Sequence, residues 1–156
     1  MGWDMLRFNL DAVALEADQG APEGFGARAA SIHSEIGGEH LAGSVIEIPP
    51  GQRAWPYHWE AALEEWLYVL TGTPTVRTPD GEEQLRAGDL VCFVAGPDGA
   101  HQVLNDSDTT CRVVMLSNRA SVNVVVYPDA AKVGVRTPWL GPNFPYQAAV
   151  DYWEGE

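Results

Sequence analysis

The sequence has 156 residues, a length typical of one domain, and 46% of them are apolar, which is enough for a hydrophobic core. Nine Lys and Arg against 22 Asp and Glu leave a formal net charge of −13. Such a negative field repels nucleic acids and anionic membranes, so we expect neither as a partner. The N-terminus shows no apolar stretch of signal-peptide length, and we expect a cytoplasmic protein.

Short strands are predicted along most of the chain. One weak helix is predicted over 9–17, and a first strand near 29–33. Further strands are predicted at 41–48, 54–60, 65–70, 75–78, 83–85, 90–94, 102–104, 112–117 and 122–127. Gly, Pro and Asp-Gly turns separate them at near-regular spacing, which predicts an all-β sandwich or barrel.

Two of these strands are nearly all apolar, 90–94 and 122–127, as is typical of strands covered on both faces. The cysteines, Cys92 and Cys111, both lie in apolar runs. We therefore expect two buried, unreactive thiols and no disulfide framework.

The C-terminal segment 132–156 has a different composition. It contains three prolines, and it is too aromatic to be disordered and too rich in proline for one regular strand or helix. We expect an extended arm that docks on its own barrel or on a partner subunit. The chain is interpreted as a single domain, 1–156, with a barrel core at about 29–127, and as a homodimer, because sheet edges need cover.

Two clusters of side chains indicate chemistry. His58 and Glu60 are two residues apart, so on a strand they point to the same face, and Glu65 begins the next strand. His101 follows a second apolar strand and a glycine-rich loop. Nitrogen and oxygen donors from two hairpins suit a first-row divalent metal that keeps positions open for water or substrate. His33 and His40 lie outside both clusters, and we expect surface roles for them.

These clusters resemble the two sequence motifs of the cupin superfamily, Gly–His-x-His–Glu–Gly and Gly–Pro-x-Gly–His–Asn. The matched residues are Gly51, His58, Glu65, Gly72, Gly88, Gly96, His101 and Asn105. The resemblance implies a cupin-type antiparallel β-barrel, a double-stranded β-helix of the jelly-roll kind. It implies a metal held by histidines and a glutamate, and it is strongest to small cupins that are named only as cupin-domain proteins or sugar-phosphate isomerases.

The chain departs from the family pattern at three places. Glu60 stands where the second histidine of the first motif is expected, the first histidine lies one residue later than usual, and Val94 replaces the proline of the second motif, whose loop is two residues longer. The ligand set implied is His58, Glu60, Glu65 and His101, and the ion zinc, manganese, iron or nickel. The alternative is a site that has lost its metal because of Glu60.

Three functions remain open from the sequence. The first is a metal-dependent isomerase or dioxygenase acting on a small oxygenated substrate, with Glu60 or Glu65 as general base. The second is a non-catalytic small-molecule sensor or binding module, and the third a structural protein with a filled barrel. A strongly anionic substrate is disfavoured, because only Arg53 and Arg112 lie near the motifs.

Overall fold

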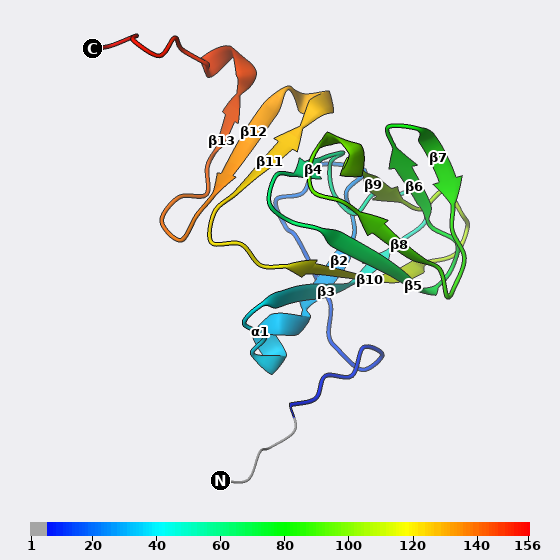
Figure 1. The fold of residues 1–156 in the computed structure, drawn as a ribbon. Coiled ribbons are helices and arrows are strands. Elements are labelled where there is room, and N and C mark those ends of the chain that lie inside the picture. The colour runs from blue at the N-terminus through cyan, green and yellow to red at the C-terminus, as the bar shows by residue number, and fades with distance from the viewer. Residues whose placement is uncertain (1–5) are drawn as a thin grey trace, which may run out of the picture.

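The computed structural model describes residues 6–156, which form three antiparallel sheets (Figure 1). The largest sheet has the order β1-β2-β3-β10-β5-β8. Its strands are β1 (Glu16–Ala17), β2 (Arg28–Ser31), β3 (Leu41–Ile48), β10 (Cys111–Asn118), β5 (Glu65–Thr71) and β8 (Leu90–Phe93). This all-β architecture confirms the fold class predicted from the sequence.

Two smaller sheets complete the barrel. One has the order β13-β12-β11-β4, with β13 (Asn143–Pro145), β12 (Lys132–Arg136), β11 (Asn123–Tyr127) and β4 (Trp59–Glu60). The other has the order β7-β6-β9, with β7 (Gly81–Gln84), β6 (Thr75–Thr78) and β9 (Gln102–Leu104). An isolated bridge pairs His58 with His101, the residues directly before β4 and β9, and so links the two smaller sheets.

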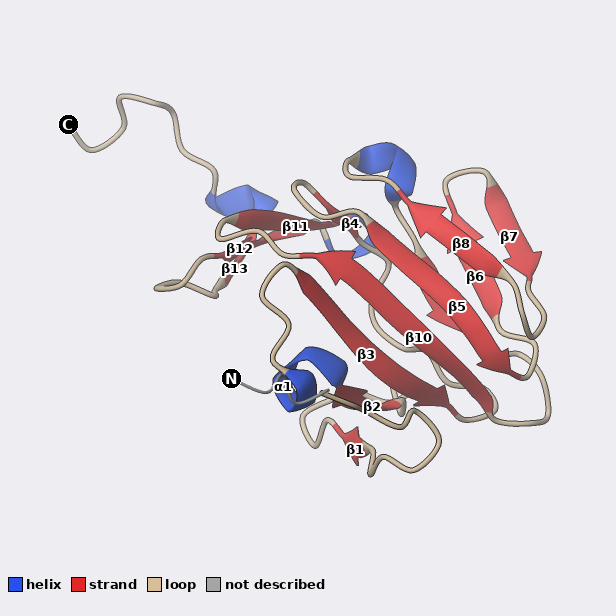
Figure 2. Cartoon of the chain, turned by 60° about the horizontal axis from the view of Figure 1, so that its bottom comes forward, coloured by secondary structure: helices blue, strands red, loops and turns tan. Residues whose placement is uncertain are grey.

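The hydrophobic core lies between the six-stranded and the three-stranded sheet (Figure 2). It uses alternate residues of each strand, as a sheet with one face on the core requires. The buried residues are Ile46, Ile48, Leu67, Val69, Val76, Leu85, Phe93, Val103, Val113 and Met115.

The predicted helix over 9–17 is wrong. The side chain of Asn9 accepts hydrogen bonds from the backbone of Asp11 and Ala12, and this turn competes with a helix. Residues 16–17 instead pair with β2 as β1. The α-helix found in the described residues is the single turn and a half of α1 (Ile32–Ile36), in which Ser31 caps the N-terminus. Three short 3₁₀ turns follow later, η1 (Pro97–Gly99), η2 (Pro128–Ala130) and η3 (Tyr146–Ala148).

The apolar run 90–94 is covered on one face only, contrary to the prediction. Strand β8 is an edge of the six-stranded sheet, and Leu90 and Cys92 point to its outer face, where they are exposed. Cys111 is buried as predicted, since β10 lies in the middle of the sheet, and both thiols are free.

The C-terminal segment begins as a strand of the barrel. Strand β12 pairs along its whole length with β11, which places Arg136 opposite Asn123, and β13 adds to the outer edge of β12. Trp139, Tyr152 and Trp153 are strongly exposed, and the last residues run away from the barrel (Figure 1). Within residues 6–156, no helix has the length and apolar character needed to cross a bilayer.

Candidate metal centre

His58 and His101 are joined through their backbones. The amide of His58 donates to the carbonyl of His101 at 3.1 Å, and the amide of His101 donates back at 2.8 Å. Residues paired in this way on antiparallel strands carry their side chains on the same face. The two imidazole rings accordingly lie 4.8 Å apart between centroids, and both are buried.

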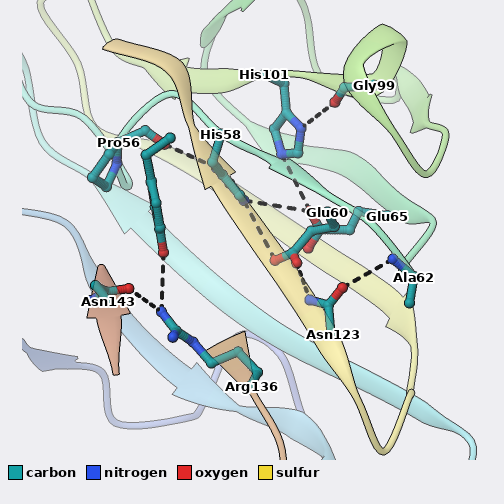
Figure 3. A network of polar contacts seen from close by, with 11 residues as sticks. Pro56, His58, Glu60, Ala62, Glu65, Gly99, His101, Asn123, Arg136 and Asn143 are labelled. Carbon is teal, nitrogen blue, oxygen red and sulfur yellow. Dashed lines mark hydrogen bonds and ion pairs between the residues drawn. The ribbon is translucent and has the colours of Figure 1, made fainter. Parts of the chain in front are cut away.

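Backbone carbonyls fix the orientation of both rings. The carbonyl of Pro56 lies 2.9 Å from Nδ1 of His58, and the carbonyl of Gly99 lies 2.9 Å from Nδ1 of His101 (Figure 3). Because a carbonyl only accepts, each Nδ1 carries the proton, and each Nε2 of a neutral ring is left with a lone pair. Phe93 stacks on the ring of His101 at 3.7 Å and restricts its rotation further.

Glu65 lies where the two Nε2 atoms converge. Its Oε2 atom is 3.7 Å from Nε2 of His58 and 3.7 Å from Nε2 of His101. The buried atoms Oε2 of Glu65 and Nε2 of His101 have no hydrogen-bond partner among the described residues. Buried polar atoms normally have a partner, so three acceptors facing one point suit a cation.

The donor set fits a divalent metal. Two ligand atoms bound to one ion at about 2.1 Å lie roughly 3.0–3.4 Å apart, close to the separations around Oε2 of Glu65. Ligand atoms from His58, Glu65 and His101 all lie within 4.8 Å of one another. A carbonyl acceptor on the far nitrogen is the usual support of a metal-bound histidine. These three residues therefore form a group that could hold a metal ion.

Glu60 lies beside this group with a different set of contacts. Its Oε1 atom is 3.9 Å from Nε2 of His58, while Oε2 accepts a short hydrogen bond from Nδ2 of Asn123 (Figure 3). The amide of Ala62 donates to Oδ1 of Asn123 at 3.0 Å and fixes the orientation of that side chain. The backbone carbonyl of Glu60 accepts from Gly96 of the second motif, which ties the two motifs together.

The pKa values of the two histidines shift in opposite directions. Burial lowers the pKa of His58, but the Glu65 carboxylate outweighs burial, and the net shift of its pKa is upward. Burial, followed by the charge of His58, lowers the pKa of His101 to about 4, so His101 is neutral at physiological pH and able to ligate. Burial also raises the pKa of Glu60.

An open pocket of about 370 Å³ adjoins the centre. Its walls include Glu60 and Glu65 together with Asn123 and Tyr127 from β11 and Arg136 from β12. The structure thus brings the four predicted residues, His58, Glu60, Glu65 and His101, into one region. The volume of the pocket suits a small ligand.

Asn123 and Arg136 were not found from the sequence. A polar residue that interrupts the apolar run 122–127 was the signal for Asn123. Arg136 lies 35 residues beyond His101 and reaches the pocket only through the β11–β12 pairing. The two arginines considered from the sequence are used elsewhere: Arg112 binds Glu47 at 3.0 Å, and Arg53 lies over the ring of Phe25.

The remaining motif residues shape the backbone. Asn105 is fully buried, and its amide donates to the carbonyls of Ile48 and Thr109, each at 2.7 Å. Gly72 has a φ of 82°, and a Cβ atom there would lie 2.8 Å from Sγ of Cys111. These residues match the motif because of packing and backbone conformation.

The chain is similar to known proteins in sequence and in fold. Residues 44–117 match the family model described as "Cupin domain". No curated protein matched the sequence. A proposed sugar phosphate isomerase from Acidithiobacillus ferrooxidans superposes with a TM-score of 0.82 and 24% identity over 93% of either chain. A sugar phosphate isomerase from Silicibacter pomeroyi, of the cupin superfamily, superposes with a TM-score of 0.82 and 16% identity, over 94% of this chain and 97% of that one.

Another solved structure carries a different activity. The polyketide cyclase RemF from Streptomyces resistomycificus gives a TM-score of 0.61 and 22% identity, over 74% of this chain and 80% of that one. Identities at this level show the fold alone. The fold and the donor group define a small antiparallel barrel with three residues that could hold a metal ion. Residues 44–117 match a cupin domain, and the chain has the fold of these cupin structures.

Proposed function

We propose that this protein is a divalent-metal-dependent isomerase that acts on a small hydroxy-carbonyl substrate in the pocket beside His58, Glu65 and His101. The observation that carries the proposal is the convergence of three buried acceptors on one point, two of them without a hydrogen-bond partner among residues 6–156. The whole-length likeness to two structures named as sugar phosphate isomerases supports the reaction class.

His58, Glu65 and His101 would hold the ion. When bound, a divalent ion polarises a carbonyl or hydroxyl oxygen of the substrate and thereby acidifies the neighbouring C–H bond. Orientation of the ligands comes from the carbonyls of Pro56 and Gly99, which fix both rings before any ion binds.

Glu60 is placed to move the proton. An isomerase transfers a proton between adjacent carbons and needs one positioned base. Glu60 lies on the pocket wall next to His58, and the bond from Asn123 leaves its other oxygen, Oε1, directed toward the centre. This assigns different roles to the two carboxylates: Glu65 binds the metal and Glu60 carries the proton.

The test begins with elemental analysis of the protein purified without chelator and without a histidine tag. We expect about one divalent ion per chain, lost in His58→Ala and kept in His40→Ala, a matched change at an exposed histidine. Proton exchange is then followed by NMR in deuterated water, with dihydroxyacetone and with dihydroxyacetone phosphate. A folded chain without metal would contradict the proposal.

A metal-loaded chain that exchanges no proton would favour a different use of the same pocket. Oxygen uptake with a bound substrate would indicate a dioxygenase. Ligand binding without turnover would indicate a sensor or binding module, for which a pocket of about 370 Å³ is also large enough.

A further inference from the structure

Arg136 brings a positive charge into a pocket that is otherwise acidic. It lies at the end of β12, opposite Asn123 on β11, and lines the same pocket as Glu60 and Glu65. In the network of Figure 3, His101 and Arg136 lie at opposite ends, with Glu60 and Asn123 between them. The pocket therefore has a donor group for a cation on one side and a guanidinium on the other.

The guanidinium is held in place by neutral oxygens. Nη1 donates to the carbonyl of Gly141 at 3.0 Å, and Nη2 donates to Oδ1 of Asn143 at 2.9 Å and weakly to the hydroxyl of Tyr127 at 3.4 Å. Nη1 also lies 3.3 Å from two further carbonyls, those of Val135 and Pro142. These contacts fix the position of the side chain without neutralising its charge.

Within residues 6–156, no carboxylate lies at ion-pair distance from Arg136. The two other partly buried arginines of the described residues, Arg77 and Arg112, are paired with Asp129 and Glu47. An arginine has five N–H donors, and the hydrogen bonds of Arg136 to the described residues come from Nη1 and Nη2, which leaves its Nε–H available. A preorganised, uncompensated guanidinium is the side chain best suited to bind a carboxylate or a phosphate.

We propose that Arg136 is the anion-binding residue of this pocket, and that the substrate is a small hydroxy-carbonyl compound carrying a phosphate or carboxylate group at the end away from the metal-binding residues. The inference rests on the proposed function for the reacting end of the substrate. It differs from the expectation from the sequence that an anionic substrate is disfavoured. The net charge of −13 repels anions at long range, but a local guanidinium, together with a divalent ion when bound, would reverse the sign of the potential inside the pocket.

Calorimetric titration of the metal-loaded, full-length protein tests the inference with three probes: glycerol phosphate, glycerate and glycerol. We expect one or both anions to bind and neutral glycerol to bind at least about tenfold more weakly. The stronger anion identifies phosphate or carboxylate as the group. Arg136→Gln should weaken anion binding about 10- to 100-fold, and Arg136→Lys less. Arg86→Gln removes the same charge at an exposed site and should leave binding unchanged.

Arg136 also joins the ends of the β12–β13 hairpin, so its replacement could disturb the fold. A second measurement therefore uses the unaltered protein: glycerol phosphate or glycerate should slow phenylglyoxal modification of Arg136, measured by peptide mass, whereas glycerol should not. Equal modification rates with and without the anions would overturn the inference, as would anion binding that Arg136→Gln leaves unchanged.

Metal content, measured on the same samples, separates the two proposals. A chain that binds metal but shows no Arg136-dependent anion binding contradicts the anion site alone. A chain that binds no metal, yet binds an anion through Arg136, contradicts the isomerase and retains the anion site.

Discussion

His58 and His101 donate a backbone hydrogen bond to each other, and this bridge joins the two smaller sheets. The same pairing that closes the barrel therefore sets the distance between the two imidazole rings. A donor group positioned by backbone pairing would need little reorganisation to bind an ion. Formation of the backbone pair also brings the two imidazole rings together.

Replacing Glu60 by Gln should separate metal binding from proton transfer. Glutamine can still accept the hydrogen bond from Asn123 but cannot take up a proton as a carboxylate does. We expect the metal content of Glu60→Gln to remain near that of the wild type, and proton exchange to fall about 100- to 10,000-fold. Elemental analysis and NMR exchange measure the two effects.

Glu65→Gln is the matched control, because it makes the same chemical change at the neighbouring carboxylate. It should lose metal, since Oε2 of Glu65 is the atom that both histidines face. If Glu60→Gln loses metal to the same extent, Glu60 is a ligand, and the four-residue set implied by the sequence resemblance is the correct one.

The sequence predicted the strands well where alternation and turn residues agree. The expected strands at 41–48 and 102–104 coincide with β3 and β9. Those at 65–70 and 122–127 differ from β5 and β11 by one residue at one end, and 112–117 differs from β10 by one residue at each end. In the region 54–60 only Trp59 and Glu60 form a strand. Before them, Arg53 and His58 make isolated bridges, Arg53 to Leu104 of β9 and His58 to His101.

What the sequence missed depends on long-range pairing. Arg136 belongs to no local motif, and only its register opposite Asn123 brings it to the pocket. Cys92 has apolar neighbours in the sequence, but it is exposed. It lies on β8, an edge strand, and no other part of the described chain covers the outer face of that strand. Local composition reports how apolar a segment is, and it does not report which face of a sheet is covered.

Gly72→Ala should destabilise the protein more than Gly51→Ala. Both glycines have a positive φ, 82° and 73°, so each substitution costs about 1–2 kcal/mol in backbone conformation. A Cβ atom on Gly51 meets nothing within 4 Å, whereas one on Gly72 would lie 2.8 Å from Sγ and 2.9 Å from Cα of Cys111. We expect an additional cost of about 1–3 kcal/mol at Gly72 from this overpacking.

Urea unfolding measures the difference in free energy of unfolding between the two variants. The cost in backbone conformation is similar in both and cancels in this difference. The contact with Cα of Cys111 cannot be relieved by a side-chain rotation, so relaxation has to move β5 or β10. Equal free energies of unfolding for the two variants would show that the sheet adjusts at no cost, contrary to this prediction.

The ion pair between Arg77 and Asp129 should contribute to stability in a pH-dependent manner. Arg77 on β6 donates to both carboxylate oxygens of Asp129 in η2, at 2.6 and 3.0 Å, and lies over the ring of Tyr57. The hydrogen bond from Arg77 holds the pKa of Asp129 below its ordinary value of 3.8. Since the folded pKa is depressed, the stabilisation is present above that value and is lost as the pH falls through the folded pKa.

Asp129→Asn should therefore cost up to about 1 kcal/mol at neutral pH, because the pair is partly exposed and screened. The difference from the wild type should shrink as the pH falls below 3.8 and through the folded pKa of Asp129, where both forms carry an uncharged side chain. Urea unfolding at neutral and at acidic pH measures it, with Asp80→Asn as control. A cost that does not change with pH would assign the effect to packing of η2 instead of to charge.

A homodimer remains a prediction, and two exposed apolar surfaces support it. The outer face of the six-stranded sheet presents Trp66, Tyr68, Leu90 and Leu116, and the C-terminal segment presents Trp139, Tyr152 and Trp153. The three exposed aromatics of the segment, at about 150–250 Å² each, offer roughly 500 Å². With the sheet face added, the area reaches the roughly 800 Å² per partner of a stable interface.

Light scattering at micromolar concentration should give twice the mass of the chain. Leu90→Arg places a charge on the sheet face at a side chain that is 55% exposed, so it should leave the fold intact and shift the mass toward the monomer. Deletion of 149–156 removes Tyr152 and Trp153 and should weaken the dimer as well, while leaving Arg136 and its partners in place. A monomer mass for the wild type would contradict the dimer. A dimer unaffected by Leu90→Arg but lost on the deletion would place the contact on the C-terminal segment alone.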